Sequence, residues 1–381
     1  MKPFIFSGDA HLAEPPDLYR DGLPAHLQQW ALWTDVEGDS ILIKMGDKTL
    51  LKVFKNIHDH KTGKLDCPDI RRLGGRNLDL RLKDMERDGV DAELVFPGIG
   101  LTFGQIMDRE AQRLSARIYN DWAWAYTDGL RDKLVAAAML PFLDMDDTIA
   151  EAERVIAIGY RTVMIPSVLP PESPQYNDPA WDRLFALCAE KEIPICIHTA
   201  TGFKNVRPMR GPGAAVFNYT TLMCDAINAI ALLTCGGVLD RNPKAKLVLS
   251  EYGAGWLLAL GERMDEGYFG HAPMVQPKLN RLPSQIVREQ VVLCVQNDLG
   301  ALRTLREQGV ETVIFATDYP HSEGTFPYSQ DLVDKILDEK EFPGLTREEC
   351  EAVLGQTAVK LFKIDESRAR NARVPEHAAV A

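Results

Sequence analysis

The chain has 381 residues, of which 45% are hydrophobic and 26% are charged, and this composition excludes a disordered protein. Its length allows one large barrel or two ordinary domains. Lys and Arg total 43 against 55 Asp and Glu, and the formal net charge of -12 argues against a nucleic-acid partner, which would require a basic face. An anionic substrate is still compatible, because a few local cations can dominate the potential of one pocket.

The seven cysteines are odd in number and scattered, with no CxxC pair. This pattern favours reduced thiols and a cytoplasmic location over a disulfide scaffold. The N-terminal sequence MKPFIFSGDAH becomes polar too soon for a signal peptide. Since no stretch reaches the roughly 18 uncharged apolar residues of a membrane span, we expect a soluble protein without a membrane partner.

Apolar runs of strand length, bounded by turn residues, recur along the chain, as is typical of buried parallel strands. We predict eight strands, at 4–6, 92–96, 134–140, 162–165, 193–197, 247–249, 291–295 and 313–316. Segments with helical spacing lie between most of them, at 111–130, 148–158, 181–191, 218–233, 299–308 and 332–337. This alternation predicts an α/β protein with a (β/α)8 barrel of the TIM type.

The positions of polar residues favour this closed barrel over an open doubly wound sheet. Polar side chains follow the first, fifth, sixth and eighth predicted strands. The first and eighth strands are neighbours in a closed barrel but often lie far apart in an open sheet. Only closure therefore lets Asp9 and His11 meet Asp318.

Two segments exceed a minimal barrel. Residues 12–80 begin Pro-rich and then alternate between 33 and 53, with turn signals at 37–39 and 45–48, which predicts a small inserted antiparallel β subdomain. Residues 365–381 are polar and Ala-rich, and we expect a loose terminus or a partner-docking arm there. The barrel domain is accordingly predicted to span residues 1–364.

The strongest local signal is the sequence Asp9-Ala10-His11 after the first apolar run. Residues two apart on a strand face the same side, so this carboxylate and this imidazole can share one centre. Such ligands suit Zn²⁺ above all, with Mn²⁺, Fe²⁺ or Co²⁺ as alternatives. A helix cap at Asp9 and an ordinary polar His11 would explain the same pair without a metal.

His198 and Asp318 repeat this placement at later strands. Each follows an apolar run at the carboxyl end of a predicted barrel strand, where the active sites of such barrels lie. A satisfied core histidine is the alternative for His198, but an unpaired buried carboxylate at Asp318 would be costly. Together these residues predict one divalent ion held by Asp9, His11, His198 and Asp318.

Other motifs are less informative. His58 and His60 flank Asp59, but nothing nearby completes a four-ligand site, so we interpret this segment as a solvated loop. A Gly-x-Ser-x-Gly elbow is absent from the sequence, which argues against a serine hydrolase.

These features resemble the amidohydrolase superfamily, in the branch that contains aminocarboxymuconate-semialdehyde decarboxylase and the hydroxybenzoate decarboxylases. The Asp-Tyr-Pro-His element is the most specific of the matches, which span nearly the whole chain in the family's order. The matching pieces are DAHLAEPP at 9–16, RLKDM at 81–85, GVD at 89–91, IH at 197–198, SEYG at 250–253, TDYPH at 317–321 and LF at 361–362.

The resemblance implies roles for single residues. Asp318 is the aspartate that binds metal and handles a proton, and His198 is the mid-barrel ligand. Asp9 and His11 stand where many relatives carry His-x-His or Glu-x-His. Glu251 stands where decarboxylase relatives often place a general acid/base histidine. A raised pKa would suit Glu251 for proton transfer, but it could equally accept hydrogen bonds from backbone amides near residues 253 and 255.

Several further residues are candidates around this centre. His321 follows Asp318 closely and can orient it or contact substrate. Glu14 is either a further ligand or a turn acid before two prolines. Cations after His198 suit a carboxylate, although a solvated loop also explains them. The substrate-binding candidates are thus Glu14, Lys204, Arg207, Arg210 and the rim aromatic Phe326.

Two enzymatic functions remain open. The first is a non-oxidative decarboxylase acting on a small aromatic or unsaturated carboxylate, favoured by the cationic loop and by the branch. The second is a metal-dependent hydrolase of a lactone, amide or carbon–carbon bond, favoured by Glu251 in place of histidine. A catalytically silent scaffold would predict a broken ligand set. The resemblance also implies a homodimer.

Overall fold

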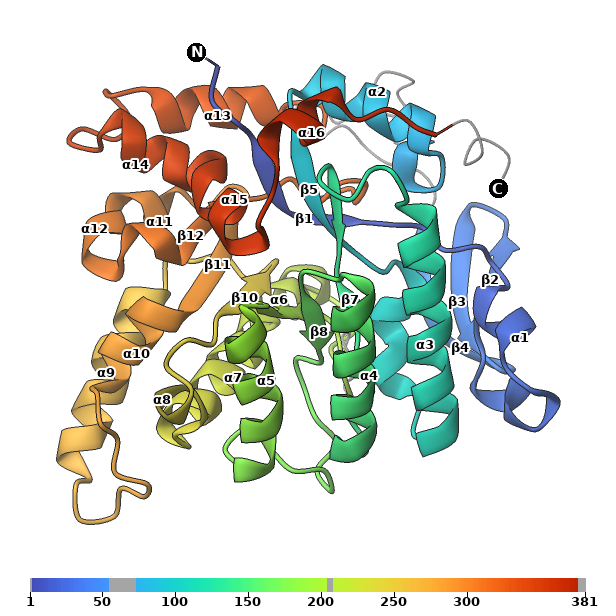
Figure 1. The fold of residues 1–381 in the computed structure, drawn as a ribbon, viewed down its shortest axis with the longest axis horizontal. Helices are drawn as coiled ribbons and strands as arrows, with labels where there is room; N and C mark the ends of the chain where they lie inside the picture. Colours follow the sequence, from blue (N-terminus) through green and yellow to red (C-terminus); the bar gives the residue numbers. More distant parts are fainter. Residues whose placement is uncertain (1, 55–72, 204–207, 376–381) are drawn as a thin grey trace.

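The computed structural model describes residues 2–54, 73–203 and 208–375. It is an α/β structure whose parallel strands are buried and surrounded by helices (Figure 1). One parallel sheet has the order β1-β5-β6 and a second has the order β12-β11-β10-β9-β8-β7. The strands are β1 (Phe6–His11), β5 (Ala92–Phe96), β6 (Leu134–Ala136), β7 (Ala138–Met139), β8 (Val163–Ile165), β9 (Ile195–His198), β10 (Leu247–Ser250), β11 (Val291–Val295) and β12 (Val313–Phe315).

At one edge the two parallel sheets are joined by the chain itself, at Ala137 between β6 and β7. The amide of Ala137 donates to the carbonyl of Val95 in β5 at 3.0 Å, and the amide of Ala138 donates to the carbonyl of Thr162, next to β8, at 3.2 Å. At the other edge, the amide of Asp318 donates to the carbonyl of Asp9 at 2.9 Å, and that of His11 donates to Tyr319 at 2.7 Å. The start and the end of the parallel strand series therefore lie side by side.

Two strands differ most from their predicted limits. The strand predicted at 4–6 begins at Phe6 and runs through Asp9 to His11, because its polar residues are buried and Ser7, Ala10 and His11 pair with β5. The predicted strand 134–140 is divided into β6 and β7 at Ala137, where the chain passes from one sheet to the other.

Helices lie between the strands and around them. Their ends follow local chemistry: the Asp144 side chain accepts from the amides of Asp146 and Asp147, and α4 ends at Gly159 with a φ of 113°. This cap starts α4 three residues before the predicted 148. The helices are α1 (Leu18–Gly22), α2 (Leu78–Asp88), α3 (Arg109–Tyr126), α4 (Met145–Ile158), α5 (Asp182–Lys191), α6 (Ala214–Thr221), α7 (Met223–Cys235), α8 (Val238–Arg241), α9 (Leu257–Gly270), α10 (Pro283–Gln290), α11 (Leu299–Arg303), α12 (Leu305–Gln308), α13 (Ser329–Leu337), α14 (Arg347–Glu351), α15 (Thr357–Phe362) and α16 (Glu366–Asn371).

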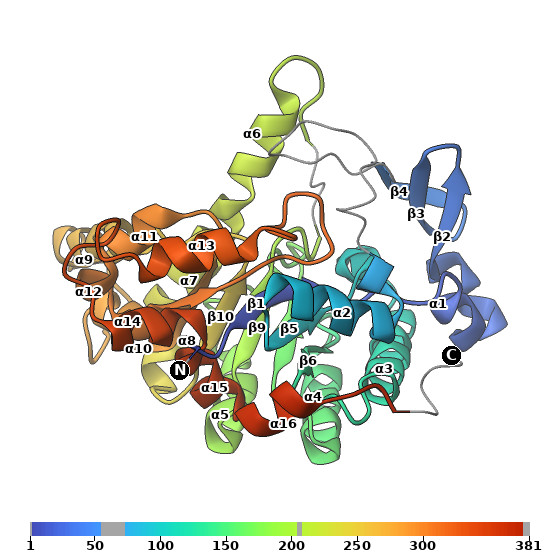
Figure 2. The same cartoon turned by 90° about the horizontal axis from the view of Figure 1, so that it is seen from above.

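A third sheet is antiparallel and lies to one side of the parallel strands (Figure 2). It contains β2 (Leu32–Glu37), β3 (Ser40–Met45) and β4 (Lys48–Phe54) in that order. Gly38 and Gly46 occupy the turns with φ values of 56° and 52°, which side chains rarely adopt. The sheet lies where the alternating pattern of residues 33–53 placed it.

The described part of the C-terminal segment is packed rather than loose. Ala369 of α16 is fully buried, and its carbonyl accepts from the Lys133 ammonium at 3.2 Å. The Arg370 guanidinium donates to the carbonyl of Pro3 at 3.2 Å and lies over the Phe4 ring. This packing differs from the expected loose terminus, because the polar sequence of α16 conceals one apolar contact face.

Helices α6 and α7 form a stretch, Ala214–Cys235, that is long and apolar enough to cross a membrane by length and composition alone. Ile230 and Leu233 of α7 are buried in the core, as in the core helix of a globular protein. In contrast, α6 projects beyond the body of the molecule (Figure 2), and its Val216 and Phe217 are exposed.

Candidate metal centre

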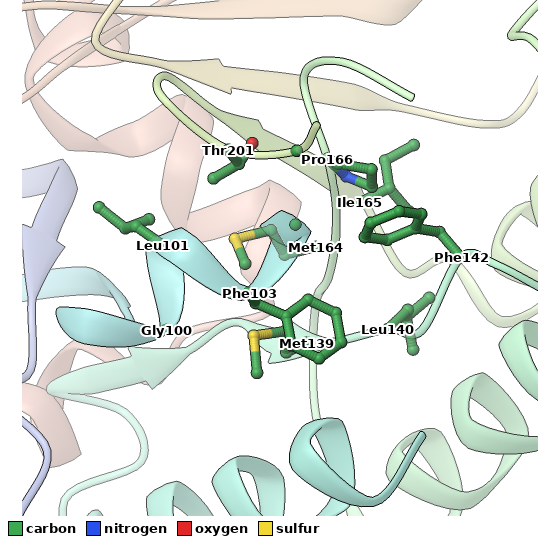
Figure 3. A pocket seen from close by; sticks show the side chains of 12 residues that line it. Gly100, Leu101, Phe103, Met139, Leu140, Phe142, Met164, Ile165, Pro166 and Thr201 are labelled. Atoms are coloured by element: carbon green, nitrogen blue, oxygen red, sulfur yellow. The ribbon is translucent and has the colours of Figure 1, made fainter. Parts of the chain in front are cut away.

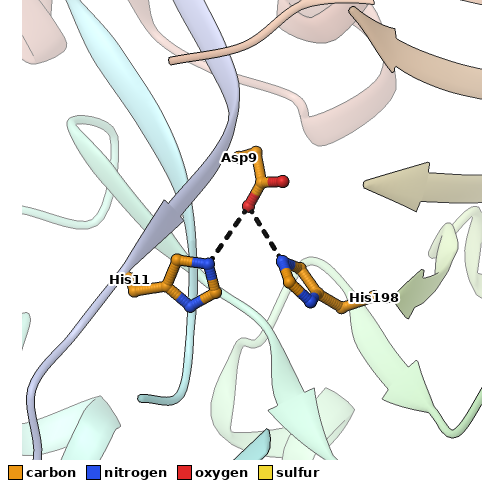
Figure 4. A group of neighbouring side chains, drawn as sticks. All are labelled: Asp9, His11 and His198. Carbon is orange, nitrogen blue, oxygen red and sulfur yellow. Dashed lines mark hydrogen bonds and ion pairs between the residues drawn. The ribbon is translucent and has the colours of Figure 1, made fainter. Parts of the chain in front are cut away.

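Strand β1 places Asp9 and His11 in the interior, next to the final residue of β9, His198. Oδ1 of Asp9 lies 3.2 Å from Nε2 of His198 and 3.5 Å from Nε2 of His11 (Figure 4). Gly8 makes this arrangement possible, because a Cβ there would lie 2.6 Å from Cδ1 of Ile314. The two imidazoles thus face one carboxylate oxygen from different strands.

Backbone carbonyls orient both imidazoles. Nδ1 of His11 lies 2.9 Å from the carbonyl oxygen of Pro97, and Nδ1 of His198 lies 2.9 Å from that of Thr199. A carbonyl only accepts, so each Nδ1 carries a proton and each Nε2 faces the centre. Burial lowers the pKa of His11 to about 3, which keeps this ring neutral.

Asp318 completes the centre from the segment that follows β12. Its Oδ1 lies 3.3 Å from Nε2 of His11 and 2.9 Å from Nδ1 of His321. Burial would raise the pKa of Asp318, but the charge of His321 and the contacts of the carboxylate with His11 and His321 hold it below its ordinary value. Burial would lower the pKa of His321, but Asp318 raises it to about 9. Asp318 is therefore a carboxylate beside a cationic His321.

Several buried polar atoms of this cluster have no hydrogen-bond partner among the described residues. They are Oδ2 of Asp9, Nε2 of His11 and Oδ2 of Asp318, whereas Oδ1 of Asp318 lies 2.9 Å from Nδ1 of the cationic His321. Burying such groups uncompensated costs several kcal/mol. Asp9, His11 and His198 can each offer one ligand atom within 4.8 Å of the others. Carboxylate oxygens and imidazole lone pairs that converge in this way fit one divalent cation.

Glu251 lies at the same centre, directly after β10. Its Oε2 is 3.7 Å from Nε2 of His198. Burial, together with the charges of Asp318 and Asp9, raises the pKa of Glu251 well above its ordinary value. The amides of Ala254 and Gly255, which could have bound Glu251, instead donate to Asp298 at 2.7 and 2.6 Å. Glu251 is thus available for proton transfer.

Two residues of the centre adopt a left-handed backbone. Asp318 has a φ of 54° and Glu251 a φ of 67°. Non-glycine residues in this region store strain of roughly 1–3 kcal/mol each, and such strain concentrates at functional sites. The turn at each strand end aims the carboxylate back over the ends of the parallel strands.

Glu14 has a different environment from the ligands. Its Oε2 accepts from the amides of Gly98 and Ile99 at 2.9 and 3.0 Å, and its Oε1 accepts from Gly100 at 2.9 Å. Burial raises the pKa of Glu14, while these amides oppose the shift. These contacts account for Glu14 as the anchor of the loop after β5, without a bound ligand.

The remaining candidates are spread more widely. Phe326 is buried and packs edge-on against Tyr319, with the ring centroids 5.3 Å apart. Arg210 is exposed. Lys204 and Arg207 lie outside the described residues, as do His58 and His60.

Sequence reasoning missed one residue that packs on two ligands. The ring of Phe96, the last residue of β5, lies 4.8 Å from His198 and 6.1 Å from His11 between ring centroids. The sequence predicted that Phe96 ends a strand, but an apolar residue at a strand end does not by itself indicate a functional site.

A small apolar pocket lies at the ends of neighbouring strands (Figure 3). Met139, Met164, Phe103 and Phe142 contribute to its wall. None of the candidate ligands lines it, so the chemistry of the centre follows from its ligand geometry rather than from this pocket.

Comparisons with known proteins show the family and the fold. An amidohydrolase family model matches residues 24–364. No curated protein matches the sequence. An amidohydrolase of Mycobacterium avium subsp. paratuberculosis K-10 is similar in structure, with a TM-score of 0.77, 19% identity and coverage of 96% of this chain and 99% of that chain.

Two decarboxylases are also similar in structure. For 5-carboxyvanillate decarboxylase of Sphingomonas paucimobilis the TM-score is 0.66 at 20% identity, covering 96% of this chain and 100% of that chain. For a dihydroxybenzoic acid decarboxylase of Polaromonas, solved with bound manganese, the TM-score is 0.61 at 14% identity, covering 95% and 97%. At these identities the likeness shows the fold alone.

Proposed function

The chain belongs to the amidohydrolase family, and from this premise we propose that it is a metal-dependent carboxy-lyase acting on a small aromatic or unsaturated carboxylate. The observation that carries the proposal is the set of unpaired buried ligand atoms from Asp9, His11 and Asp318, which a divalent cation would satisfy. Both decarboxylases and hydrolases occur among amidohydrolase-type enzymes. The choice between these two activities therefore rests on the residues of this chain.

Asp9, His11, His198 and Asp318 would hold the ion. A bound divalent ion supplies positive charge that anchors the carboxylate of the substrate and a neighbouring oxygen. Zn²⁺ is our first expectation from the ligand types, and the manganese reported for the Polaromonas decarboxylase makes Mn²⁺ a close alternative, with Fe²⁺ and Co²⁺ after it. Cationic His321, which is partly exposed, adds a positive charge at the mouth of the centre.

Glu251 is the proposed acid. Its pKa is raised well above the ordinary value of a glutamate, which favours the protonated, proton-donating form, and its position beside His198 puts the proton next to the substrate. Glu251 donates this proton to the ring or vinyl carbon that carries the carboxylate. The bond from this carbon to the carboxylate then breaks, its electron pair returns to the unsaturated system, and carbon dioxide leaves. Glu251 regains a proton from solvent.

A hydrolase of a lactone, amide or carbon–carbon bond is the second candidate. The observation that favours it is Asp318, whose buried Oδ2 is without a hydrogen-bond partner among the described residues. In a hydrolase this oxygen would accept the proton of an attacking water molecule.

The proposal also covers the closure of the barrel, the oligomeric state and the cellular location. The pairing of both sheet edges supports a closed (β/α)8 barrel, with the antiparallel sheet as a subdomain inserted within residues 12–80. A homodimer and a cytoplasmic location are parts of the proposal that rest on the resemblance and on the reduced cysteines.

The test is a panel of aromatic and unsaturated carboxylates given to protein that has been stripped of metal and refilled with Zn²⁺, Mn²⁺, Fe²⁺ or Co²⁺ in turn. We expect metal-dependent release of carbon dioxide, with His198→Ala as the blank. Metal-dependent hydrolysis products without carbon dioxide would establish the second candidate instead. An absence of metal binding would contradict both.

A further inference from the structure

Arg81 of α2 contacts the backbone of the candidate ligand His11, although α2 contributes no candidate ligand itself. Its side chain is fully buried. Nη1 donates to the carbonyl oxygen of His11 at 2.7 Å. Nε donates to Oε2 of Glu93 on β5 at 2.8 Å, and Nη2 lies 2.7 Å from the same oxygen. One rigid guanidinium therefore joins the ligand-bearing end of β1 to the neighbouring strand.

The same guanidinium contacts the residue after Asp318. Cζ of Arg81 lies 5.1 Å from the centre of the Tyr319 ring. The Tyr319 hydroxyl donates to Asp84, also on α2, at 2.5 Å and accepts from the amide of Gly74 at 2.8 Å. The carbonyl of Tyr319 in turn accepts from the amide of His11. Helix α2 thus contacts two chain segments that carry candidate ligands, the end of β1 with His11 and the segment after β12 with Asp318.

We propose that Arg81 is a positioning residue of the metal centre, which sets the approach of His11 to Asp318. The inference rests on the proposed metal site. Its physical basis is that Arg81 contacts both the backbone of His11 and the ring of Tyr319, the residue that follows Asp318. Nε2 of His11 and Oδ1 of Asp318 lie 3.3 Å apart, so a shift of either segment would change this distance. The planar, always charged fork of arginine fixes this spacing better than a flexible ammonium.

An ordinary buried ion pair would stabilise the fold without affecting the metal. The test must therefore separate stability from ligand geometry. Removal of Arg81 alone would leave the buried carboxylate of Glu93 unpaired, which can unfold the protein. The informative variants are the double variant Arg81→Met/Glu93→Leu, which removes both charges, and the conservative Arg81→Lys.

Arg161→Met is the matched control. Arg161 also pairs with an acid, Asp132 at 2.8 Å, and also donates to a backbone carbonyl, that of Lys363 at 3.1 Å. It lies before β8, at the opposite ends of the parallel strands from the ligands. Its loss should lower the melting temperature without altering the centre.

The experiment is a titration of each metal-free protein with Co²⁺, followed by its visible absorption bands, alongside thermal melting. We expect Co²⁺ binding to be weakened about 10- to 100-fold in the double variant, with altered bands, less weakened in Arg81→Lys, and unchanged in Arg161→Met. Wild-type affinity and bands in a folded double variant would overturn the inference. If the double variant does not fold, wild-type affinity and bands in Arg81→Lys would overturn it. Failure of the wild-type protein to bind Co²⁺ would instead overturn the proposed function.

Discussion

Nε2 of His11 and Oδ1 of Asp318 lie 3.3 Å apart, although the neutral His11 ring carries its proton on Nδ1, which donates to the carbonyl of Pro97. Two facing acceptors repel each other unless a cation or a proton lies between them. The same Nε2 lies 3.5 Å from Oδ1 of Asp9. This relationship is the physical reason to expect a divalent ion, and it leads to the first prediction.

Replacement of His198 by alanine should abolish metal binding and leave the fold intact, because the residue is the last of strand β9 and its Nε2 faces the centre. Metal content should fall from one equivalent per chain to a small fraction, and activity should fall at least ~100-fold. Metal analysis and circular dichroism on the same sample provide the check. His26→Ala, at an exposed histidine, is the control. A His198→Ala variant that retains a full metal equivalent would contradict the ligand assignment.

Glu251→Gln should retain the metal and lower kcat by roughly 10²- to 10⁴-fold, as expected for loss of a general acid. The pKa of Glu251 is raised, so the active protonated form prevails below that pKa and is lost as the pH rises through it. The kcat of the wild-type enzyme should therefore decline on the alkaline side. In Glu251→Gln this decline should vanish from the residual activity. An unchanged pH profile in the variant would exclude Glu251 as the acid.

Removal of metal with a chelator should destabilise the protein, since the buried Asp9 and Asp318 would then lose the charge compensation that the ion adds to that of cationic His321. At a metal concentration of 100 times Kd, the expected contribution is about 2.7 kcal/mol of unfolding free energy. Thermal melts before chelation, after chelation and after metal is restored would measure the shift. His198→Ala serves as the control, because its melting temperature should not respond to either treatment.

Glu14→Gln should destabilise the loop after β5 without loss of metal. The glutamine amide nitrogen cannot accept the hydrogen bonds that one carboxylate oxygen now accepts, so a buried backbone amide is left unpaired. The expected cost is about 1–3 kcal/mol, measurable by urea unfolding. Metal content should remain at one equivalent. A variant of normal stability that has lost its metal would show that Glu14 is a ligand.

The sequence by itself determined the α/β class, the parallel strands and which polar residues end them. These features are encoded locally, in apolar runs bounded by turn residues, and this local pattern singled out Asp9, His11, His198 and Asp318. Its failures were local too: buried polar residues extend β1 beyond its apolar run, and the buried Ala369 of α16 lies among polar and charged residues.

Only the tertiary structure decided what surrounds those residues. The carbonyls that orient the imidazoles, the three amides that occupy Glu14 and the contact of Arg81 with His11 join positions that are distant in sequence, apart from His198 and Thr199. The sequence does not show which backbone carbonyl or amide will bind a given side chain, since every residue but proline carries both groups. Which of them faces a given side chain is settled when the strands and helices pack together.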